Sequence, residues 1–280
     1  MNIVVPDTNY EDRVNALVTV NPLLRPGSGI FTAGRDTSKT SERYAKTNDI
    51  GVLESLNAAG FLVSAYKERK AHGGLNQNFK PYKAVYQNEK FGKLPDGTSF
   101  TIQQRGSSDG TSKLILGGGL FRIICTNTMV VGSKLFDDIA IKHMGEVDEP
   151  LKDLVERLIA SAPKVFSTVK DMTARVLTPT EARQFAEKAI ALRFDTAEVE
   201  VDPLELLRAR RESDKGDDLW KVFNRVQESL TQGGDYKSQS KVTKEDGSVR
   251  TPRKVSAVKN IELDWNMNKG LWMAAESYLN

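Results

Sequence analysis

Residues 98–132, TSFTIQQRGSSDGTSKLILGGGLFRIICTNTMVVG, carry the strongest local signals for structure in the chain. Two runs of β-forming residues, 99–102 and 113–116, are separated by a cluster of turn formers that includes Asp109-Gly110. Because Asp-Gly tolerates the positive φ values of tight turns, the two runs are expected to pair as a β-hairpin.

A third strand is expected to follow this hairpin. The glycines at 117–119 interrupt the apolar pattern and predict an end to the second strand, and residues 120–125 then read Leu-Phe-Arg-Ile-Ile-Cys. A strand that is apolar on both faces is typical of the centre of a sheet. The stretch therefore predicts a three-stranded antiparallel meander.

The flanking residues complete an α+β pattern, in which an antiparallel sheet with an N-terminal helix precedes a helical half. Upstream, the sequence predicts a helix over 49–59 and strands over 61–66 and 82–86. Downstream, apolar residues recur at helical spacing over 151–176, with a break near Ser161 because a proline interrupts the pattern. Further helices, each opened by capping residues, are expected over 178–192, over 202–211, from 217 or 218 to an end at the glycines 233–234, and from 260 or 264 to 278.

Composition and pattern divide the chain into three regions. Residues 1–46 are rich in polar and turn-forming residues and are expected to form a flexible N-terminal arm. Residues 47–147 are expected to form the sheet region, and residues 148–280 a helical region that carries a basic β-ribbon or loop at 235–259. A chain of 280 residues can form one large domain or two smaller ones, so the last two regions could also be one continuous domain.

The bulk composition predicts a cytoplasmic protein without membrane contact. Hydrophobic residues make up 39% of the chain and charged residues 28%, as in soluble globular proteins. No segment approaches the roughly 20 apolar residues of a membrane span, and the first residues do not resemble a secretory signal. The single cysteine, Cys125, excludes an intramolecular disulfide and a zinc site built on cysteine pairs.

Residues 235–259 are a markedly basic segment. They contain seven Lys and Arg against three Asp and Glu, an excess larger than the net charge of +3 for the whole chain. These cations could neutralise the phosphates of a nucleic acid, or they could form an ordinary solvated face. The candidate contacts are Lys237, Lys241, Arg250, Arg253, Lys254 and Lys259.

The predicted sheet offers a second set of candidate contacts. Three basic residues lie on or beside the expected strands, namely Arg105, Lys113 and Arg122. The aromatic residues Tyr82, Tyr86 and Phe121 could stack on unpaired bases, as proteins that bind single strands require. The alternative is that the aromatic residues belong to the core and that Arg122 is a buried ion-pair partner.

Catalytic and metal-binding patterns are weak. Cys125 and His143 could form a nucleophile and its base, but a cysteine in an apolar strand is typical of a small buried side chain. Asp137 and Asp138 could bind Mg²⁺, although helix capping and the helix dipole also explain carboxylates near a helix start. The glycines at 117–119 lack the Gly-Lys-Ser/Thr and the following helix of a phosphate-binding loop. The sequence therefore assigns no catalytic residue, metal or cofactor.

The order of several motifs resembles a family of phage and plasmid proteins. The motifs are the turn at 107–111, the segment Arg-Ile-Ile-Cys-Thr-Asn-Thr-Met at 122–129 followed by His143, residues 218–228 with the glycines 233–234, and residues 250–254 leading to 263–266 and 271–272. The family is known as domain of unknown function 932, and Ser108 stands where its pattern has a histidine. The resemblance implies a shared fold and a setting in mobile genetic elements of bacterial hosts, and it supplies no reaction.

The leading hypothesis is a non-enzymatic protein of a phage or other mobile element that binds single-stranded nucleic acid, DNA in preference to RNA. A helix packed on an antiparallel meander and followed by a long helix is similar to the ring-forming single-strand annealing proteins of phage recombination, an analogy of fold alone. That analogy implies a homo-oligomer that anneals strands. The alternatives are a factor that binds and inhibits a host defence complex, and a metal-dependent nuclease.

Overall fold

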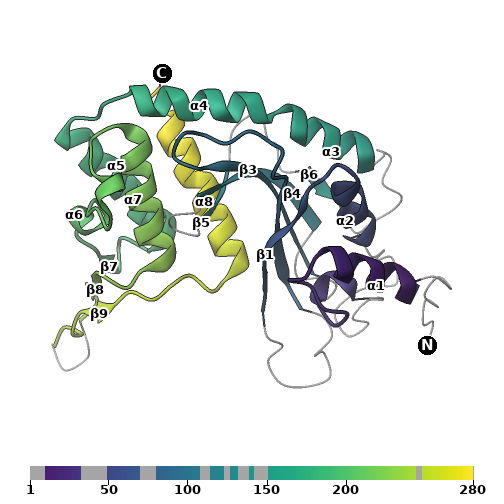
Figure 1. Cartoon of the computed structure of the whole chain (residues 1–280). Coiled ribbons are helices and arrows are strands. Elements are labelled where there is room, and N and C mark those ends of the chain that lie inside the picture. The colour runs from purple at the N-terminus through teal and green to yellow at the C-terminus, as the bar shows by residue number, and fades with distance from the viewer. Residues whose placement is uncertain are drawn as a thin grey trace. The chain divides into compact units, whose positions relative to one another are not determined.

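The chain folds into helices and antiparallel sheets, which confirms the α+β class (Figure 1). The computed structural model describes residues 10–32, 49–69, 80–107, 114–122, 127–131, 139–141, 151–243 and 248–279. The chain divides into a first unit, residues 1–128 and 136–162, and a second unit, residues 129–135 and 163–280. None of the described helices has both the length and the apolar character needed to cross a membrane.

A six-stranded sheet belongs mainly to the first unit. Its strands are β1 (Leu62–Glu68), β2 (Tyr82–Gln87), β3 (Ser99–Gly106), β4 (Leu114–Arg122), β5 (Asn127–Val130) and β6 (Ile139–Ile141). Strands β1 to β5 are neighbours in chain order, and β6 also pairs with β4. The pairings of β1 with β2, β2 with β3, β3 with β4 and β4 with β6 are all antiparallel, as expected for a meander.

The second strand of the predicted hairpin does not end at the glycines. β4 runs without interruption through 117–119, and these glycines pair in register with Gln103, Ile102 and Thr101 of β3. The prediction of a break was therefore wrong, because the backbone ladder with β3 holds the glycines in an extended conformation that their own low strand preference would not give. The predicted third strand merges in part into β4.

The N-terminal segment is partly anchored, which corrects the expectation of a flexible arm over its described residues 10–32. This segment forms helix α1 (Tyr10–Val20) and a single 3₁₀ turn, η1 (Gly29–Phe31). Arg13 donates two hydrogen bonds of 2.8 Å to the carboxylate of Glu54 in α2. The buried Asn21 accepts a 2.8 Å hydrogen bond from the backbone of Val63 in β1. Contacts distant in sequence thus order this segment.

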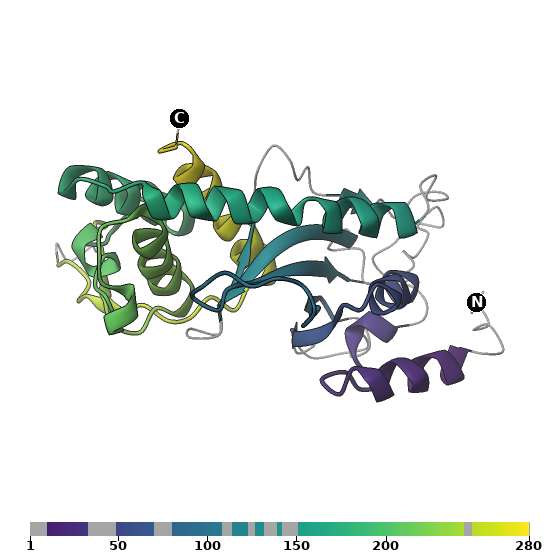
Figure 2. The same ribbon diagram turned by 45° about the horizontal axis from the view of Figure 1, so that its top comes forward.

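Two helices accompany the sheet in the first unit, α2 (Asp49–Ala58) and α3 (Leu151–Ala160), and they contact each other (Figures 1 and 2). α2 begins at the predicted residue, and its Val52, Leu53 and Leu56 are fully buried. The amphipathic stripe of α3 buries Leu154, Val155 and Leu158. The spacing of these residues is the helical period that predicted both helices.

A chain of buried hydrogen bonds joins the sheet to the start of α2. The Tyr86 hydroxyl donates to Gln104 Oε1 over 2.6 Å, and Gln104 Nε2 donates to the Tyr82 hydroxyl over 2.7 Å. The Tyr82 hydroxyl in turn donates to Asp49 Oδ1 over 2.7 Å. All four side chains are buried, so each hydrogen bond satisfies groups that would be costly to leave without a partner.

The second unit is mainly helical. Its helices are α4 (Ala162–Ala174), whose first residue belongs to the first unit, α5 (Pro179–Arg193), α6 (Pro203–Leu206), α7 (Leu219–Gln232) and α8 (Ile261–Glu276), with a 3₁₀ turn η2 (Glu212–Asp214). The predicted break falls at Ser161, and the predicted capping box forms between Thr178 and Glu181. The helix predicted over 202–211 is shorter than expected, because α6 ends at Leu206. Arg211, the predicted last residue, lies outside the helix and forms ion pairs with its side chain.

Aromatic side chains form the centre of the second unit, where α5, α7 and α8 contact one another (Figures 1 and 2). Phe223 stacks on Trp220 with ring centroids 5.6 Å apart, and Trp272 meets Phe223 edge-on at 5.9 Å. Phe185 lies 6.5 Å from Phe223. Offset and edge-on pairs of this kind stabilise a core beyond the area that they bury. The aromatic residues of α7 and α8 therefore belong to the core of the second unit.

Replacing Tyr82 with Phe is expected to destabilise the protein more than replacing Tyr86 with Phe. Tyr82→Phe removes one hydrogen bond to a buried carboxylate and one from a buried amide, whereas Tyr86→Phe removes one neutral hydrogen bond. We expect losses of about 2–4 and about 1 kcal/mol in the free energy of unfolding, measured by urea denaturation. Equal losses would contradict the connected chain of hydrogen bonds.

Alkaline pH is expected to unfold the first unit. Burial raises the pKa of Tyr66, Tyr82 and Tyr86 above the ordinary value of 10.0, and the nearby carboxylates of Glu68 and Asp49 raise it further. The unfolded chain therefore releases protons first, so stability is intact below pH 10 and falls as the pH rises above it. Absorbance titration should show these tyrosines ionising only together with the loss of circular dichroism. Reversible ionisation of all seven tyrosines in the folded protein would contradict this.

Candidate nucleic-acid interface

The basic segment forms one side of a small sheet in the second unit. We call residues 235–259 the basic ribbon, which the structure describes over 235–243 and 248–259. Its strands β8 (Lys237–Ser240) and β9 (Arg253–Lys254) pair antiparallel, and β8 also pairs with β7 (Val199–Glu200). A bridge between Thr243 and Val249 extends the ribbon outward.

At Gly233, just before the ribbon begins, the backbone passes very close to the backbone of Val255. Gly233 ends α7 with a φ of +60°, and a Cβ atom there would lie 2.5 Å from the Val255 carbonyl oxygen. Only glycine fits such a position without strain. The next residue, Gly234, donates a 2.7 Å hydrogen bond to the same carbonyl, so the outgoing and returning chains are joined at the base of the ribbon.

Buried and charged side chains fix the base of the ribbon to the core. Tyr236 and Val255 are buried and face each other across the two chains, where the Val255 backbone donates to the Tyr236 carbonyl. Arg193, at the end of α5, donates hydrogen bonds to the carbonyls of Leu230 and Ser256. The base of the ribbon is thus held by α5, by the end of α7 and by its own apolar pair.

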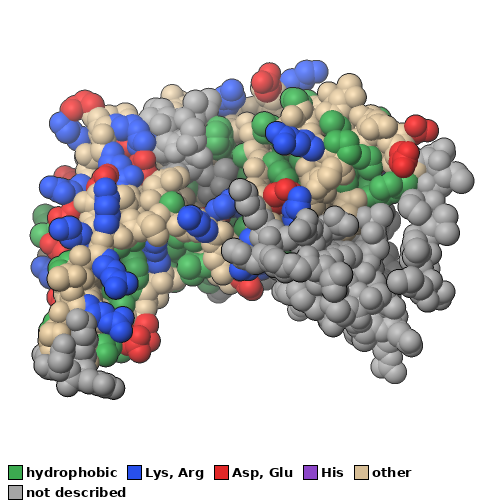
Figure 3. Space-filling view, turned by 90° about the horizontal axis from the view of Figure 1, so that it is seen from below, with side chains coloured by type: hydrophobic (Ala, Val, Ile, Leu, Met, Phe, Trp, Pro, Cys, Tyr) green, Lys and Arg blue, Asp and Glu red, His purple; other side chains and the backbone are tan. Residues whose placement is uncertain are grey.

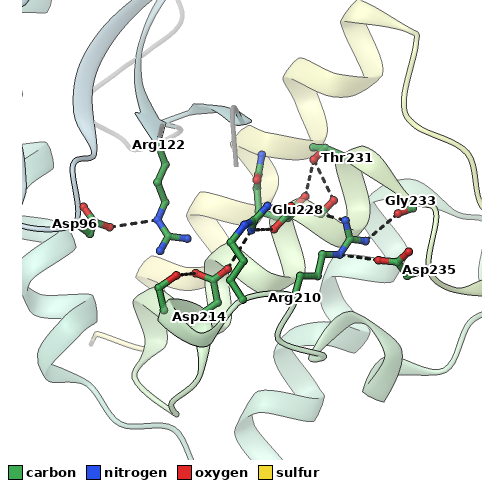
Figure 4. A network of polar contacts seen from close by, with 11 residues as sticks. Asp96, Arg122, Arg210, Asp214, Glu228, Thr231, Gly233 and Asp235 are labelled. Carbon is green, nitrogen blue, oxygen red and sulfur yellow. Dashed lines mark hydrogen bonds and ion pairs between the residues drawn. The ribbon is translucent and has the colours of Figure 1, made fainter. Parts of the chain in front are cut away.

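A network of arginines and carboxylates lies between α6 and α7 (Figure 4). Arg211 forms two hydrogen bonds of 2.6 Å with the nearly buried carboxylate of Glu228 and one of 3.1 Å with Asp214. The hydrogen bonds and the charge of Glu228 raise the pKa of Arg211. Arg210 reaches Asp235 at 3.1 Å and donates to the Gly233 carbonyl over 2.8 Å. Asp235, the one described acid of the ribbon, is therefore neutralised by a residue outside it.

The predicted cations of the ribbon are all exposed, and none forms an ion pair with a described residue. The members of this group are Lys237, Lys241, Arg250, Arg253, Lys254 and Lys259. Lys241 donates to the Thr196 carbonyl over 3.1 Å, which orients the side chain without cancelling its charge. In the view from below, Lys and Arg side chains gather over the part of the second unit that carries β7 to β9 (Figure 3). The ribbon is therefore a cationic surface.

The strand register separates these cations onto two faces. Lys237 stands directly opposite Lys254, and Arg253 stands opposite Ser238. Like charges in directly opposed positions are destabilising, so the Lys237–Lys254 pair costs stability that a Lys–Glu pair would not. Side chains alternate along a strand, so Lys237 and Lys254 share one face and Ser238 and Arg253 share the other.

The face that carries Arg253 is hollowed into a pocket of about 340 Å³. Arg250 and Arg253 supply positive charge, and Glu198, in the loop before β7, supplies a carboxylate. The remaining lining residues are Val199, Ser238, Ser240, Val242 and Thr251. No local sequence pattern predicts this pocket, because Glu198 and Val199 reach the ribbon only through the pairing of β7 with β8.

The candidate contacts on the large sheet are placed differently. Arg105 and Arg122 are buried, and Arg122 lies 3.5 Å from the Asp96 carboxylate (Figure 4), as the alternative interpretation of this residue expected. Tyr82 and Tyr86 are buried in the hydrogen-bonded chain, so the prediction that they stack on bases is wrong for this structure. Phe121 is half-buried. The sheet therefore gives nucleic acid fewer accessible groups than the ribbon does.

Several candidate residues lie outside the described part of the chain. These are Lys113, Cys125, Asp137, Asp138 and His143. Among the residues that are described, no group of three or more His, Cys, Asp and Glu is arranged to hold a metal ion. The predictions on these five residues stay predictions.

Comparison with known proteins gives a family and two relatives. The family model described as "Domain of unknown function (DUF932)" matches residues 37–255, which include most of the basic ribbon. The chain is 28% identical over 263 residues to UPF0380 protein YafZ of Escherichia coli strain K12, covering 94% of this chain and 92% of that protein. UPF0380 protein YfjQ of the same organism is 26% identical over 262 residues, with the same coverage. No solved structure matches the chain significantly.

Replacing Gly233 with Ala is expected to loosen the ribbon, whereas Gly234→Ala is the matched control. Both glycines have positive φ, but a Cβ at Gly234 would meet nothing within 4 Å. We expect Gly234→Ala to cost about 1 kcal/mol from backbone strain and Gly233→Ala about 2 kcal/mol more from the backbone clash. Urea denaturation should give this order, and faster amide exchange in 235–243 should accompany Gly233→Ala. Equal losses of unfolding free energy in the two variants would show that the backbone at Gly233 has room for a Cβ atom.

Proposed function

Because this chain belongs to the DUF932 family, a domain of unknown function, we propose its function from its own geometry. The protein binds single-stranded nucleic acid through the basic ribbon. The mechanism is neutralisation of backbone phosphates by the exposed lysines and arginines, with release of the counterions that those phosphates had condensed. No covalent step is part of this proposal.

The observation that carries the proposal is the absence of described ion-pair partners for the ribbon cations. Several other surface cations of the second unit do have them: Arg175 pairs with Glu181, Arg183 with Glu187, Arg208 with Glu205, Lys215 with Glu212 and Lys221 with Asp218. The exposed lysines 164, 170 and 188, like the ribbon cations, form no ion pair with a described residue. The ribbon differs in two respects. Its described acid, Asp235, is paired with Arg210 from outside the ribbon, and Lys237 stands directly opposite Lys254. Such an arrangement lowers the stability of the free protein and favours an anionic ligand.

A single strand is the form of ligand that we propose. The two faces of the ribbon carry cations, so a flexible backbone can follow the surface more closely than a stiff duplex can. The pocket beside Arg250 and Arg253 can receive a base that is not paired. DNA is the first ligand to test, with RNA as the comparison. The finer proposal is a homo-oligomer that anneals complementary strands in the cytoplasm of a bacterial host.

Reversing the charges of Arg250, Arg253 and Lys254 to Glu is expected to weaken binding of single-stranded DNA roughly tenfold or more at low salt. If six phosphates are neutralised, the wild-type protein should show a slope of about −4 for log affinity against log salt concentration. The triple variant should lose about 2 from that slope, because three of the contacts are gone. Fluorescence anisotropy with a labelled oligonucleotide at several salt concentrations measures both quantities.

The control is a triple variant with the same change in net charge, Lys164→Glu, Lys170→Glu and Lys188→Glu. These exposed lysines lie on α4 and α5, away from the ribbon in sequence and on other elements. The control should keep the wild-type slope. Equal losses in both variants would mean that net charge, and not the ribbon, governs binding. If the wild-type protein binds no oligonucleotide at low salt, the proposal fails, and an acidic protein surface becomes the partner to search for.

A further inference from the structure

We propose that the pocket on the Arg253 face of the ribbon holds one nucleotide of the bound strand, and that Glu198 selects a base with an exocyclic amino group. This inference rests on the proposed function and adds a base preference to it. The chemistry comes from three kinds of residue among the described ones that line the cavity: two arginines, three residues that carry hydroxyl groups and one glutamate. Each kind matches a different part of a nucleotide.

The charged residues that line the pocket do not form ion pairs with one another. Glu198 lines the same pocket as Arg250 and Arg253, yet it forms no ion pair with any described residue, and neither do the two arginines. An anion acceptor and a cation donor therefore remain available on the walls of one cavity. A nucleotide offers the complementary pair, because its phosphate accepts hydrogen bonds and its base amino group donates them.

Arg250 and Arg253 are the lining residues that can bind the phosphate of the nucleotide. Guanidinium groups bind phosphate oxygens through two parallel hydrogen bonds, which fixes orientation as well as charge. Ser238 stands directly opposite Arg253 across the two strands, so its hydroxyl lies on the same face. Ser240 and Thr251 add two further hydroxyl groups to the lining. These groups can donate to phosphate or sugar oxygens, which position a strand without reading its sequence.

The lining also includes apolar residues and Glu198, which can contact the base. Val199 and Val242 line it, and Val242 is 48% exposed, so its side chain is available to contact the flat face of a base. The volume of about 340 Å³ lies at the lower end of the range for pockets that bind small ligands, which suits one nucleotide. The lining thus orders a phosphate contact, an apolar contact and a polar acceptor in one site.

Glu198 gives the pocket its selectivity. A carboxylate only accepts hydrogen bonds, and the amino group of cytosine is a donor that acidic side chains recognise. Thymine presents a carbonyl oxygen and a methyl group where cytosine has the amino group, so it would leave the carboxylate without a donor. The pocket should therefore favour cytosine over thymine by about fivefold for each occupied site.

Three hydrogen bonds join the segments that line the pocket. Gln239 Nε2 donates to the Arg250 carbonyl over 2.6 Å, which joins the segment that carries Arg250 to β8. Lys241 Nζ donates to the Thr196 carbonyl over 3.1 Å, and the Lys241 backbone donates to the Glu198 carbonyl over 2.7 Å. The segment that carries Glu198 and the segment that carries Arg250 are thereby both joined to β8 or to Lys241, the residue that follows it.

The test compares Glu198→Gln with Glu200→Gln. Glu200 is the next residue but one in the chain, but it pairs with Gln239 on the face opposite to the pocket. Both variants remove one negative charge from β7 or its approach, so they alter the electrostatic term similarly. The measurement is the ratio of affinities for oligo-dC and oligo-dT of equal length, by fluorescence anisotropy at mildly alkaline pH, where oligo-dC remains unfolded.

We expect the wild-type protein and Glu200→Gln to prefer oligo-dC about fivefold, and Glu198→Gln to bring the ratio close to one, because an amide can both donate and accept. The salt slope should be the same for all three proteins. If the wild-type protein binds both strands equally, or if Glu198→Gln keeps the preference, the inference fails while the proposed function stands. If no strand binds at low salt, the proposed function itself fails.

Discussion

The ion pair between Arg210 and Asp235 engages the one acid of the basic ribbon that the structure describes. Without it, the carboxylate at the base of the ribbon would be available to the neighbouring Lys237 and would cancel part of the charge. The Asp235 side chain is 65% exposed, so the pair adds little to stability by itself. The pair instead positions the start of the ribbon, because Arg210 also donates to the Gly233 carbonyl. Arg210 thereby links Asp235 to the residue at which α7 ends.

The ribbon is attached to the core mainly through groups other than its own cations, although Lys241 donates to the Thr196 carbonyl. Buried Tyr236 and Val255, the close backbone approach at Gly233 and the hydrogen bonds of Arg193 attach it to the helical core of the second unit. Because apolar and backbone contacts do this work, the charged side chains are not needed for attachment. An unfavourable pair such as Lys237 opposite Lys254 is then tolerated, at the cost of some stability, where a ligand is to be bound.

Local signals in the sequence predicted local structure well. The capping box at Thr178 and the helix caps at Asp218 and Asn260 all form, since each depends on residues within one turn. Features that depend on distant contacts were missed, among them the anchoring of residues 10–32 and the continuity of β4. The basic ribbon could be found from composition alone. Its pocket could not, because Glu198 joins it only through strand pairing.

The most direct test of the central claim is to identify where a bound strand touches the protein. A single-stranded oligonucleotide that carries photoreactive 5-iodouracil would be cross-linked to the full chain at low salt, and the modified peptides would be identified by mass spectrometry. The account predicts cross-links in peptides that cover β8, β9 and the loop before β7, and their loss at high salt. Cross-links confined to the first unit, with the ribbon unmodified, would contradict it.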